Sequence, residues 1–74
     1  MLIRPTYPRM RVLRAVAGFG ERGVNCTELY ERLLHDGAPL TVPTIYRVAK
    51  ELAMAGLLQR ERSDDGKVFY RSCC

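Results

Sequence analysis

The chain has 74 residues and a net charge of +4, with 12 basic residues, ten of them arginine, against 8 acidic residues. A chain of this length forms a single small domain, here expected over residues 1–74, which buries about 60% of its unfolded surface. The hydrophobic fraction of 47% is that of a globular chain rather than a disordered one, and no apolar run approaches the ~18 residues of a membrane span.

The first predicted helix spans residues 7–18. Thr6 can cap its first turn with a side-chain acceptor, and Pro8 falls where a missing N–H costs no hydrogen bond. Its buried stripe, at helical spacing, consists of Val12, Leu13, Val16 and Ala17. Away from the centre of that stripe lie Arg9, Arg11 and Arg14. A glycine-rich break over residues 18–23 ends this helix.

A second helix is predicted to begin after Asn25. The Asn25 side chain can cap it, and Glu28 three residues later completes a capping box. The residues expected inside are Leu29 and Leu33, with Tyr30 or Leu34 beside them. The helix is expected to end at Asp36-Gly37, because glycine favours the backbone conformation that closes a helix.

The third predicted helix carries the most informative pattern in the chain. Thr41 can cap it, and Pro43 lies in its first turn. Its buried stripe consists of Ile45, Val48, Ala49, Leu52 and Ala55. The opposite face carries Pro43, Tyr46, Arg47, Lys50 and Met54, with Thr44 toward its edge.

Two interpretations of this polar face compete. A phenol, a guanidinium and an ammonium project together from the first two turns, where a recognition helix meets base edges and phosphates. Lysine and arginine are also common on helix faces that contact only water, and Tyr46 can pack at the margin of the core. The segments on either side of the helix favour the DNA interpretation.

After Gly56 the pattern changes from helix to strand. The segments 57–62 and 67–71 flank Ser63-Asp64-Asp65-Gly66, whose Asp-Gly pair is a strong signal for a hairpin turn. Positive charge on this hairpin comes from Arg60, Arg62, Lys67 and Arg71, partly offset by Asp64 and Asp65. Three helices followed by a two-stranded β-hairpin predict an α+β fold, mostly α, of the winged helix-turn-helix type.

The order of these segments resembles the N-terminal DNA-binding domain of the ferric uptake regulator family of bacterial metal-dependent repressors. The matching segments are Arg4-Pro5-Thr6-Tyr7-Pro8-Arg9-Met10-Arg11-Val12-Leu13, Thr27-Glu28-Leu29-Tyr30-Glu31-Arg32-Leu33, Thr44-Ile45-Tyr46-Arg47-Val48 with Leu52 and Gly56-Leu57, and Asp65-Gly66-Lys67-Val68-Phe69-Tyr70. They cover nearly the entire chain in the right order. The resemblance implies a winged helix that binds double-stranded DNA and regulates transcription.

The resemblance also implies roles for single residues. Tyr46 matches the tyrosine that meets thymine methyl groups, and Arg47 matches its neighbour that contacts bases or phosphate. Arg4 matches a basic residue that enters an A·T-rich minor groove, and Arg9 matches an arginine that contacts phosphate. Pro43 departs from the small residue usual in that turn. Together, the residues expected to contact DNA are Arg4, Thr6, Arg9, Arg11, Thr41, Pro43, Thr44, Tyr46, Arg47, Lys50, Arg60, Arg62 and Lys67.

Metal sensing is not carried over from the resemblance. The family's C-terminal dimerisation domain, with its structural zinc and regulatory metal, has no counterpart in this chain, which ends at Cys74. His35 falls in the last turn of the second helix, where it suits a contact with the helix dipole or with solvent. One histidine and three scattered cysteines lack the spacing of a four-ligand zinc site, so we expect no metal and no cofactor.

The cysteines leave alternatives open. Cys26 is either a small, partly buried residue or a thiolate stabilised by the start of the second helix. Cys73 and Cys74 can form an intermolecular disulfide, hold a soft metal between two chains, or have no role. An odd cysteine count and the lack of a signal sequence in residues 1–9 predict a cytoplasmic protein. No catalytic constellation is visible, so we expect no enzyme activity.

The leading hypothesis is sequence-specific binding of double-stranded DNA, expected to be A·T-rich, with the third helix in the major groove. The hairpin and the N-terminal arm would contact flanking backbone or minor groove. The alternatives are a winged-helix protein-interaction module and a redox-responsive regulator acting through the terminal cysteines. The sequence leaves the oligomeric state open: one small domain contacts one half-site, so family-like affinity would need a second copy, paired as a homodimer on DNA or through Cys73 and Cys74. In reducing solution we expect a monomer. Neither a membrane nor a small-molecule substrate is expected.

Overall fold

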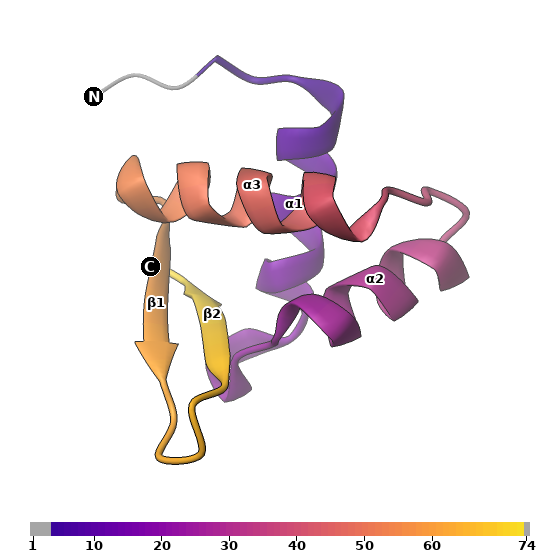
Figure 1. Cartoon of the computed structure of the whole chain (residues 1–74). Helices are drawn as coiled ribbons and strands as arrows, with labels where there is room; N and C mark the ends of the chain where they lie inside the picture. Colours follow the sequence, from indigo (N-terminus) through magenta and orange to yellow (C-terminus); the bar gives the residue numbers. More distant parts are fainter. Residues whose placement is uncertain (1–3, 74) are drawn as a thin grey trace.

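The chain folds into three α-helices followed by a two-stranded antiparallel sheet (Figure 1). The structure, a computed structural model, describes residues 4–73. The elements are α1 (Tyr7–Gly18), a short 3-10 turn η1 (Gly20–Arg22), α2 (Cys26–His35), α3 (Val42–Met54), β1 (Leu58–Arg62) and β2 (Val68–Ser72). This order confirms the predicted winged helix-turn-helix fold. Within residues 4–73, none of the helices combines the length and the apolarity needed to cross a membrane.

Each helix begins after the N-cap residue that the sequence predicts. Thr6 and Thr41 each accept a hydrogen bond from the backbone N–H three residues on, both at 3.4 Å. Asn25 makes a complete capping box, in which its side chain accepts from Glu28 N at 2.8 Å and its own N–H donates to Glu28 Oε1 at 3.2 Å. These caps satisfy N–H groups that have no partner inside the helix, which is why the helices start where they do.

Replacing Asn25 by alanine is expected to lower the free energy of unfolding by about 1 kcal/mol, because the first turn of α2 loses its side-chain acceptor. Urea denaturation followed by circular dichroism measures this loss. Asn25→Ser is the matched control, since serine also caps well and should retain most of the stability. Equal losses in both variants would contradict a capping role for the side chain.

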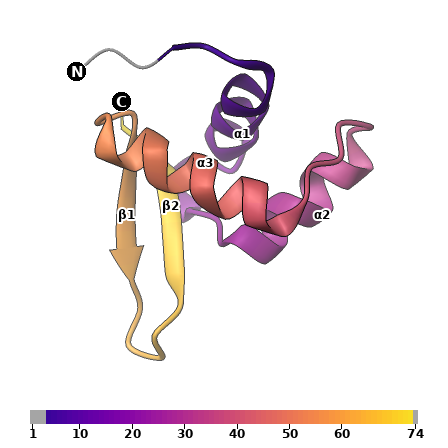
Figure 2. The same cartoon turned by 45° about the horizontal axis from the view of Figure 1, so that its top comes forward.

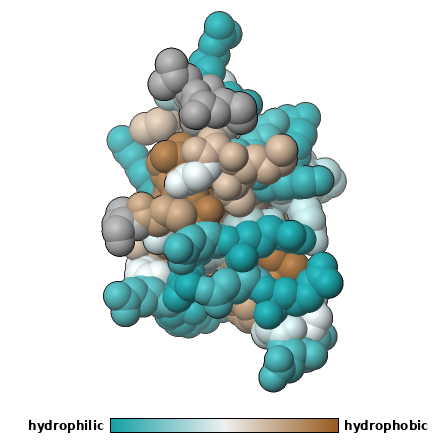
Figure 3. Space-filling view, turned by 90° about the vertical axis from the view of Figure 1, so that its left-hand side faces the viewer, coloured by the Kyte–Doolittle hydropathy of each residue, from teal (hydrophilic) through white to brown (hydrophobic). Residues whose placement is uncertain are grey.

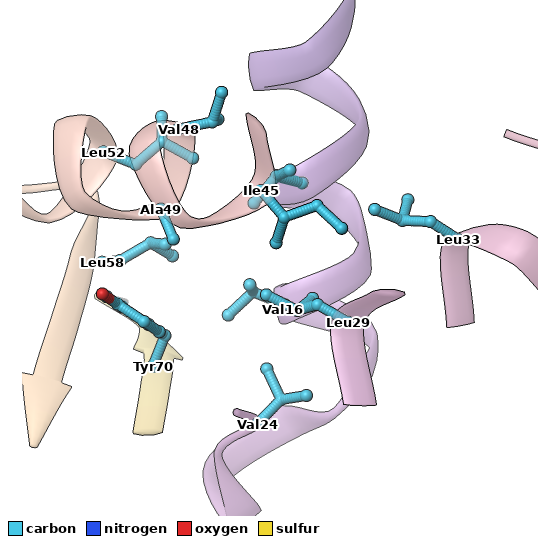
Figure 4. Packing of buried hydrophobic residues seen from close by; sticks show 11 residues of the cluster. Val16, Val24, Leu29, Leu33, Ile45, Val48, Ala49, Leu52, Leu58 and Tyr70 are labelled. Atoms are coloured by element: carbon cyan, nitrogen blue, oxygen red, sulfur yellow. The ribbon is translucent and has the colours of Figure 1, made fainter. Parts of the chain in front are cut away.

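The core lies where the three helices meet the sheet (Figure 4). The predicted stripe of α3 is buried through Ile45, Val48, Ala49 and Leu52, with Ala55 half-buried after the helix end. Facing it are Val12, Val16, Val24, Leu29, Leu33, Leu58 and Tyr70. On α2, Tyr30 packs against this core whereas Leu34 is 53% exposed, which decides between the two alternatives left by the sequence.

The hairpin is tied to the helices by a bridge that the sequence does not predict. β1 pairs with β2 so that Arg60 lies opposite Tyr70. On the other edge of β2, Tyr70 exchanges two backbone hydrogen bonds with Val24, at 2.8 and 2.9 Å. Strands are predicted from polar and apolar residues that alternate over several positions. A single bridging residue such as Val24 has no such pattern, so the sequence does not predict the bridge. It anchors the hairpin to the connection between α1 and α2.

The N-terminal arm and the hairpin flank α3. In Figures 1 and 2 α3 crosses α1; the arm, here residues 4–6, lies on one side of α3, and the hairpin extends from the other side. Gly56, with φ of 81°, turns the chain out of α3 and into β1, and Gly66, with φ of 87°, closes the hairpin. Residues with a side chain rarely adopt these left-handed conformations. The outer face of α3 therefore lies between two projecting segments.

Candidate nucleic-acid interface

The outer face of α3 presents its predicted polar residues to solvent. Of the residues predicted on this face, Pro43, Tyr46, Arg47, Lys50 and Met54 are exposed and Thr44 is half-buried; Tyr46 is 50% exposed. At the start of the helix the Thr41 hydroxyl donates to Thr44 Oγ1 at 2.8 Å, so these two side chains hold each other in place. Because the apolar stripe is turned into the core, cationic and aromatic groups share one outward surface.

The hairpin contributes three exposed basic side chains, Arg60, Arg62 and Lys67. Lys67 N donates to Asp65 Oδ1 at 3.1 Å, and a hydrogen bond from the Ser63 hydroxyl is the main cause that lowers the pKa of Asp65. Asp65 therefore stays ionised and serves the turn. Figure 3 shows hydrophilic surface over the lower part of this side of the molecule and a hydrophobic area above it.

The sequence pattern predicted that Arg71 adds free positive charge to the hairpin, and this prediction is wrong. Its Nη2 forms an ion pair with Glu61 and donates to Gln59 Oε1 at 3.1 Å. Both partners lie on β1, the neighbouring strand. The prediction failed because the charge pattern along a chain does not show which residues stand side by side across a hairpin.

On the arm side, Arg4 is exposed and Thr6 is half-buried at its cap position. Arg9 is engaged by two other segments: its Nη1 donates to the Arg4 carbonyl at 2.8 Å, and its Nε and Nη2 donate to Glu51 Oε1 at 3.3 and 3.2 Å. The sequence did not predict this arrangement, because Arg9 and Glu51 are 42 residues apart. A phosphate contact by Arg9 stays a prediction.

Arg11 lies apart from the other candidate residues. It lines a hollow of about 170 Å³ between α1 and α2, together with Arg14, Arg32 and Asp36. Arg32 pairs with Asp36 at 3.1 Å. In the described part of the chain, this hollow has no lining residue from α3 or from the hairpin. The structure thus brings the arm, α3 and the hairpin together and leaves Arg11 on a different surface.

A second hollow, of about 420 Å³, lies where the start of α2, α3 and the hairpin meet. It is lined by Asn25, Cys26, Thr27, Tyr46, Gly66, Lys67 and Val68. Sequence reasoning missed this hollow because it depends on the Val24–Tyr70 bridge, which brings the hairpin beside α2. Burial raises the pKa of the Cys26 thiol, which favours a small, partly buried residue over a stabilised thiolate.

The described residues do not fit a metal site of the type found in metal-dependent regulators. Within residues 4–73 there is no group of three histidine, cysteine or carboxylate side chains placed to hold a metal ion, and His35 is exposed. We expect a chelator to leave the circular dichroism spectrum and DNA binding of this chain unchanged. Tightly held, stoichiometric zinc after dialysis, with loss of fold on chelation, would contradict this prediction.

Three helices, a hairpin and a polar outer face on the third helix define a winged helix-turn-helix domain. The model of the Ferric uptake regulator family matches residues 2–74, and the chain belongs to this family. Over 68 residues it is 34% identical to the ferric uptake regulation protein of Neisseria meningitidis and 31% identical to that of Shigella flexneri. Each alignment covers 92% of this chain but 47% and 46% of the respective relative.

Solved structures share this fold. The ferric uptake regulator of Vibrio cholerae superimposes with a TM-score of 0.86 at 24% identity, covering 97% of this chain and 55% of that one. The regulator of Pseudomonas aeruginosa, determined with manganese, gives a TM-score of 0.86 at 26% identity, with coverages of 95% and 52%. The chain thus spans about half the length of the relatives that it matches.

Proposed function

We propose that this domain binds double-stranded DNA as a transcription regulator, with α3 in the major groove. The outer face of α3 carries the proposal, because Tyr46, Arg47 and Lys50 face outward together from a helix whose other face is buried. A helix of this width fits the major groove, and its first turns reach base edges. Membership of the ferric uptake regulator family supports the same function.

The proposed contacts divide by element. Tyr46 packs against thymine methyl groups, and Arg47 contacts bases or phosphate beside it. Thr41, Pro43, Thr44 and Lys50 complete the groove contacts of α3, and Arg60, Arg62 and Lys67 meet the flanking backbone. Arg4 precedes Pro5, which favours an extended backbone, so its guanidinium can reach a narrow A·T-rich minor groove with enhanced negative potential.

We also propose that residues 1–74 act as one DNA-binding unit, with two copies on neighbouring half-sites. A single small domain covers one half-site, so high affinity requires a second copy. Cys73 is exposed, whereas Cys74 lies outside the described residues. Pairing through these cysteines stays a prediction. Non-reducing electrophoresis should show an oxidised dimer that is lost when both residues are replaced by serine.

A fluorescence-anisotropy titration tests the proposed function. The chain is titrated with an A·T-rich duplex and with a G·C-rich duplex of equal length, at salt concentrations from about 50 to 200 mM. Binding should favour the A·T-rich duplex, and the logarithm of the association constant should fall by about 0.9 per phosphate contact for each unit of log salt. An absence of salt-dependent binding would support a protein-interaction module instead.

A further inference from the structure

We propose that Arg9 and Glu51 form a positioning pair that holds the N-terminal arm beside α3. Through the arm, this pair sets how strongly the domain prefers A·T-rich sequence at the flank of its site. The inference rests on the proposed DNA binding and assigns Arg9 a role other than contact with phosphate. It also assigns a role to Glu51, an acidic residue on the helix proposed to enter DNA.

The pair joins three segments of the fold at one guanidinium. Arg9 on α1 donates from Nε and Nη2 to Glu51 Oε1 on α3, at 3.3 and 3.2 Å. From Nη1 it donates to the Arg4 carbonyl on the arm, at 2.8 Å. The Arg9 and Glu51 side chains are only 24% and 36% exposed, so water competes less for these bonds than at an open surface.

The arm needs such a contact to have a fixed direction. Arg4 and Pro5 are both exposed, so burial of their side chains does little to hold them. The hydrogen bond to the Arg4 carbonyl fixes the point from which the Arg4 side chain leaves the backbone. The arm lies on one side of α3 (Figures 1 and 2), so this bond sets the direction of Arg4 relative to the helix.

The charges favour a positioning role over a phosphate contact. Within α3, Glu51 is the one acidic residue, and an unpaired carboxylate there would repel a DNA backbone. Arg9 neutralises it, and three of the five N–H groups of the Arg9 guanidinium already donate to protein oxygens. The pair as a whole carries no net charge. It therefore contributes little to counterion release, which depends on cations placed against phosphates.

The experiment measures the ratio of affinities for two duplexes that share one core and differ only in A·T-rich or G·C-rich flanks. Arg9→Ala and Glu51→Ala should each lower this ratio by about threefold, toward that of Arg4→Ala, and the double variant should fall no further than either single one. Glu51→Gln keeps an oxygen that accepts from Arg9 and should retain most of the ratio. Glu31→Ala removes an exposed carboxylate from α2 and should leave the ratio unchanged.

The Glu51→Ala variant decides between the two roles, because one role changes the ratio of the two affinities and the other changes both affinities by the same factor. If Arg9 contacts phosphate, Glu51→Ala will strengthen binding to both duplexes alike, and Arg9→Ala will weaken both alike and reduce the salt slope by about 0.9. That result would overturn the positioning pair. If Arg9→Ala unfolds, as circular dichroism would show, the comparison of Glu51→Ala with Glu51→Gln and Glu31→Ala carries the test.

Failure of this inference is separable from failure of the proposed function. A wild-type chain that prefers the A·T-rich flank and loses affinity on Arg47→Ala supports DNA binding by α3, whatever the Arg9 and Glu51 variants do. With that result in hand, an unchanged flank ratio in Glu51→Ala removes the positioning pair alone. A wild-type chain that binds neither duplex would overturn both proposals together.

Discussion

Replacing Arg47 by alanine is expected to weaken binding to every duplex and to reduce the slope of log affinity against log salt by about 0.9, if its contact is to one phosphate. Arg47 is exposed on α3, so its removal should leave the fold intact. Arg14→Ala is the matched control, because Arg14 is also an exposed arginine but lines the hollow between α1 and α2. Equal salt slopes for wild type and Arg47→Ala would argue against a phosphate contact here.

Tyr46 tests the other component of the same surface. Tyr46→Ala is expected to relax the preference at one base pair by about 1–3 kcal/mol, because a ring that packs against a thymine methyl group is lost. Tyr46→Phe keeps the ring and should keep the preference. Competition with duplexes that carry single-base substitutions measures both effects. A uniform loss of affinity in Tyr46→Ala, without a change in preference, would contradict base recognition by this side chain.

The order of elements and most of the buried positions were predictable because they are local properties of the chain. Ala17 is the exception: it was expected in the buried stripe of α1 but is exposed, while Ala15 packs against the core. The caps at Thr6, Asn25 and Thr41 are each recognised from a residue type and its position before an apolar repeat. The Asp65-Gly66 pair predicts the hairpin for the same reason, because a tight turn needs a residue that adopts positive φ, as Gly66 does here. Spacing within one helix also predicted the outward face of α3.

Contacts between distant segments were not predictable. The Val24–Tyr70 bridge and the Arg9–Glu51 pair each join residues that are far apart in the sequence, and no local pattern marks either of them. Arg71 shows the same difficulty, since its charge was counted as exposed although Glu61 neutralises it across the hairpin. Charge totals therefore overstate how many of the arginines are available for an anionic partner.

A general consequence concerns the ten arginines of the chain. Arg9, Arg22, Arg32 and Arg71 are ion-paired within the fold. The outward face of α3 and the exposed side chains of the hairpin and the arm carry Arg4, Arg47, Arg60 and Arg62, together with both lysines. The remaining two, Arg11 and Arg14, line the hollow between α1 and α2. Cations gathered on the arm, α3 and the hairpin produce a directed field that steers an anionic partner toward these segments. This grouping, rather than the net charge of +4, supports binding to DNA.

The largest effect on the whole domain is expected from Ile45, the buried residue next to Tyr46 on α3. Its side chain has no solvent exposure and packs in the centre of the core (Figure 4). Ile45→Ala should lower the free energy of unfolding by about 2–5 kcal/mol, through lost burial and the cavity left behind. That loss is comparable to the whole stability of a domain of this size, so the chain should unfold and lose DNA binding together.

Because Ile45→Ala is expected to unfold, two milder variants make the loss of stability measurable. Ile45→Val removes one methylene group and should cost about 0.5–1.5 kcal/mol, which leaves a folded chain whose unfolding by urea can be measured. Met54→Ala is the matched control, because Met54 belongs to the same helix but is 71% exposed. An Ile45→Ala chain with the thermal melt of the wild type would contradict the burial of this face of α3. The outward direction of Tyr46 and Arg47 depends on that burial, so the proposed recognition surface would fall with it.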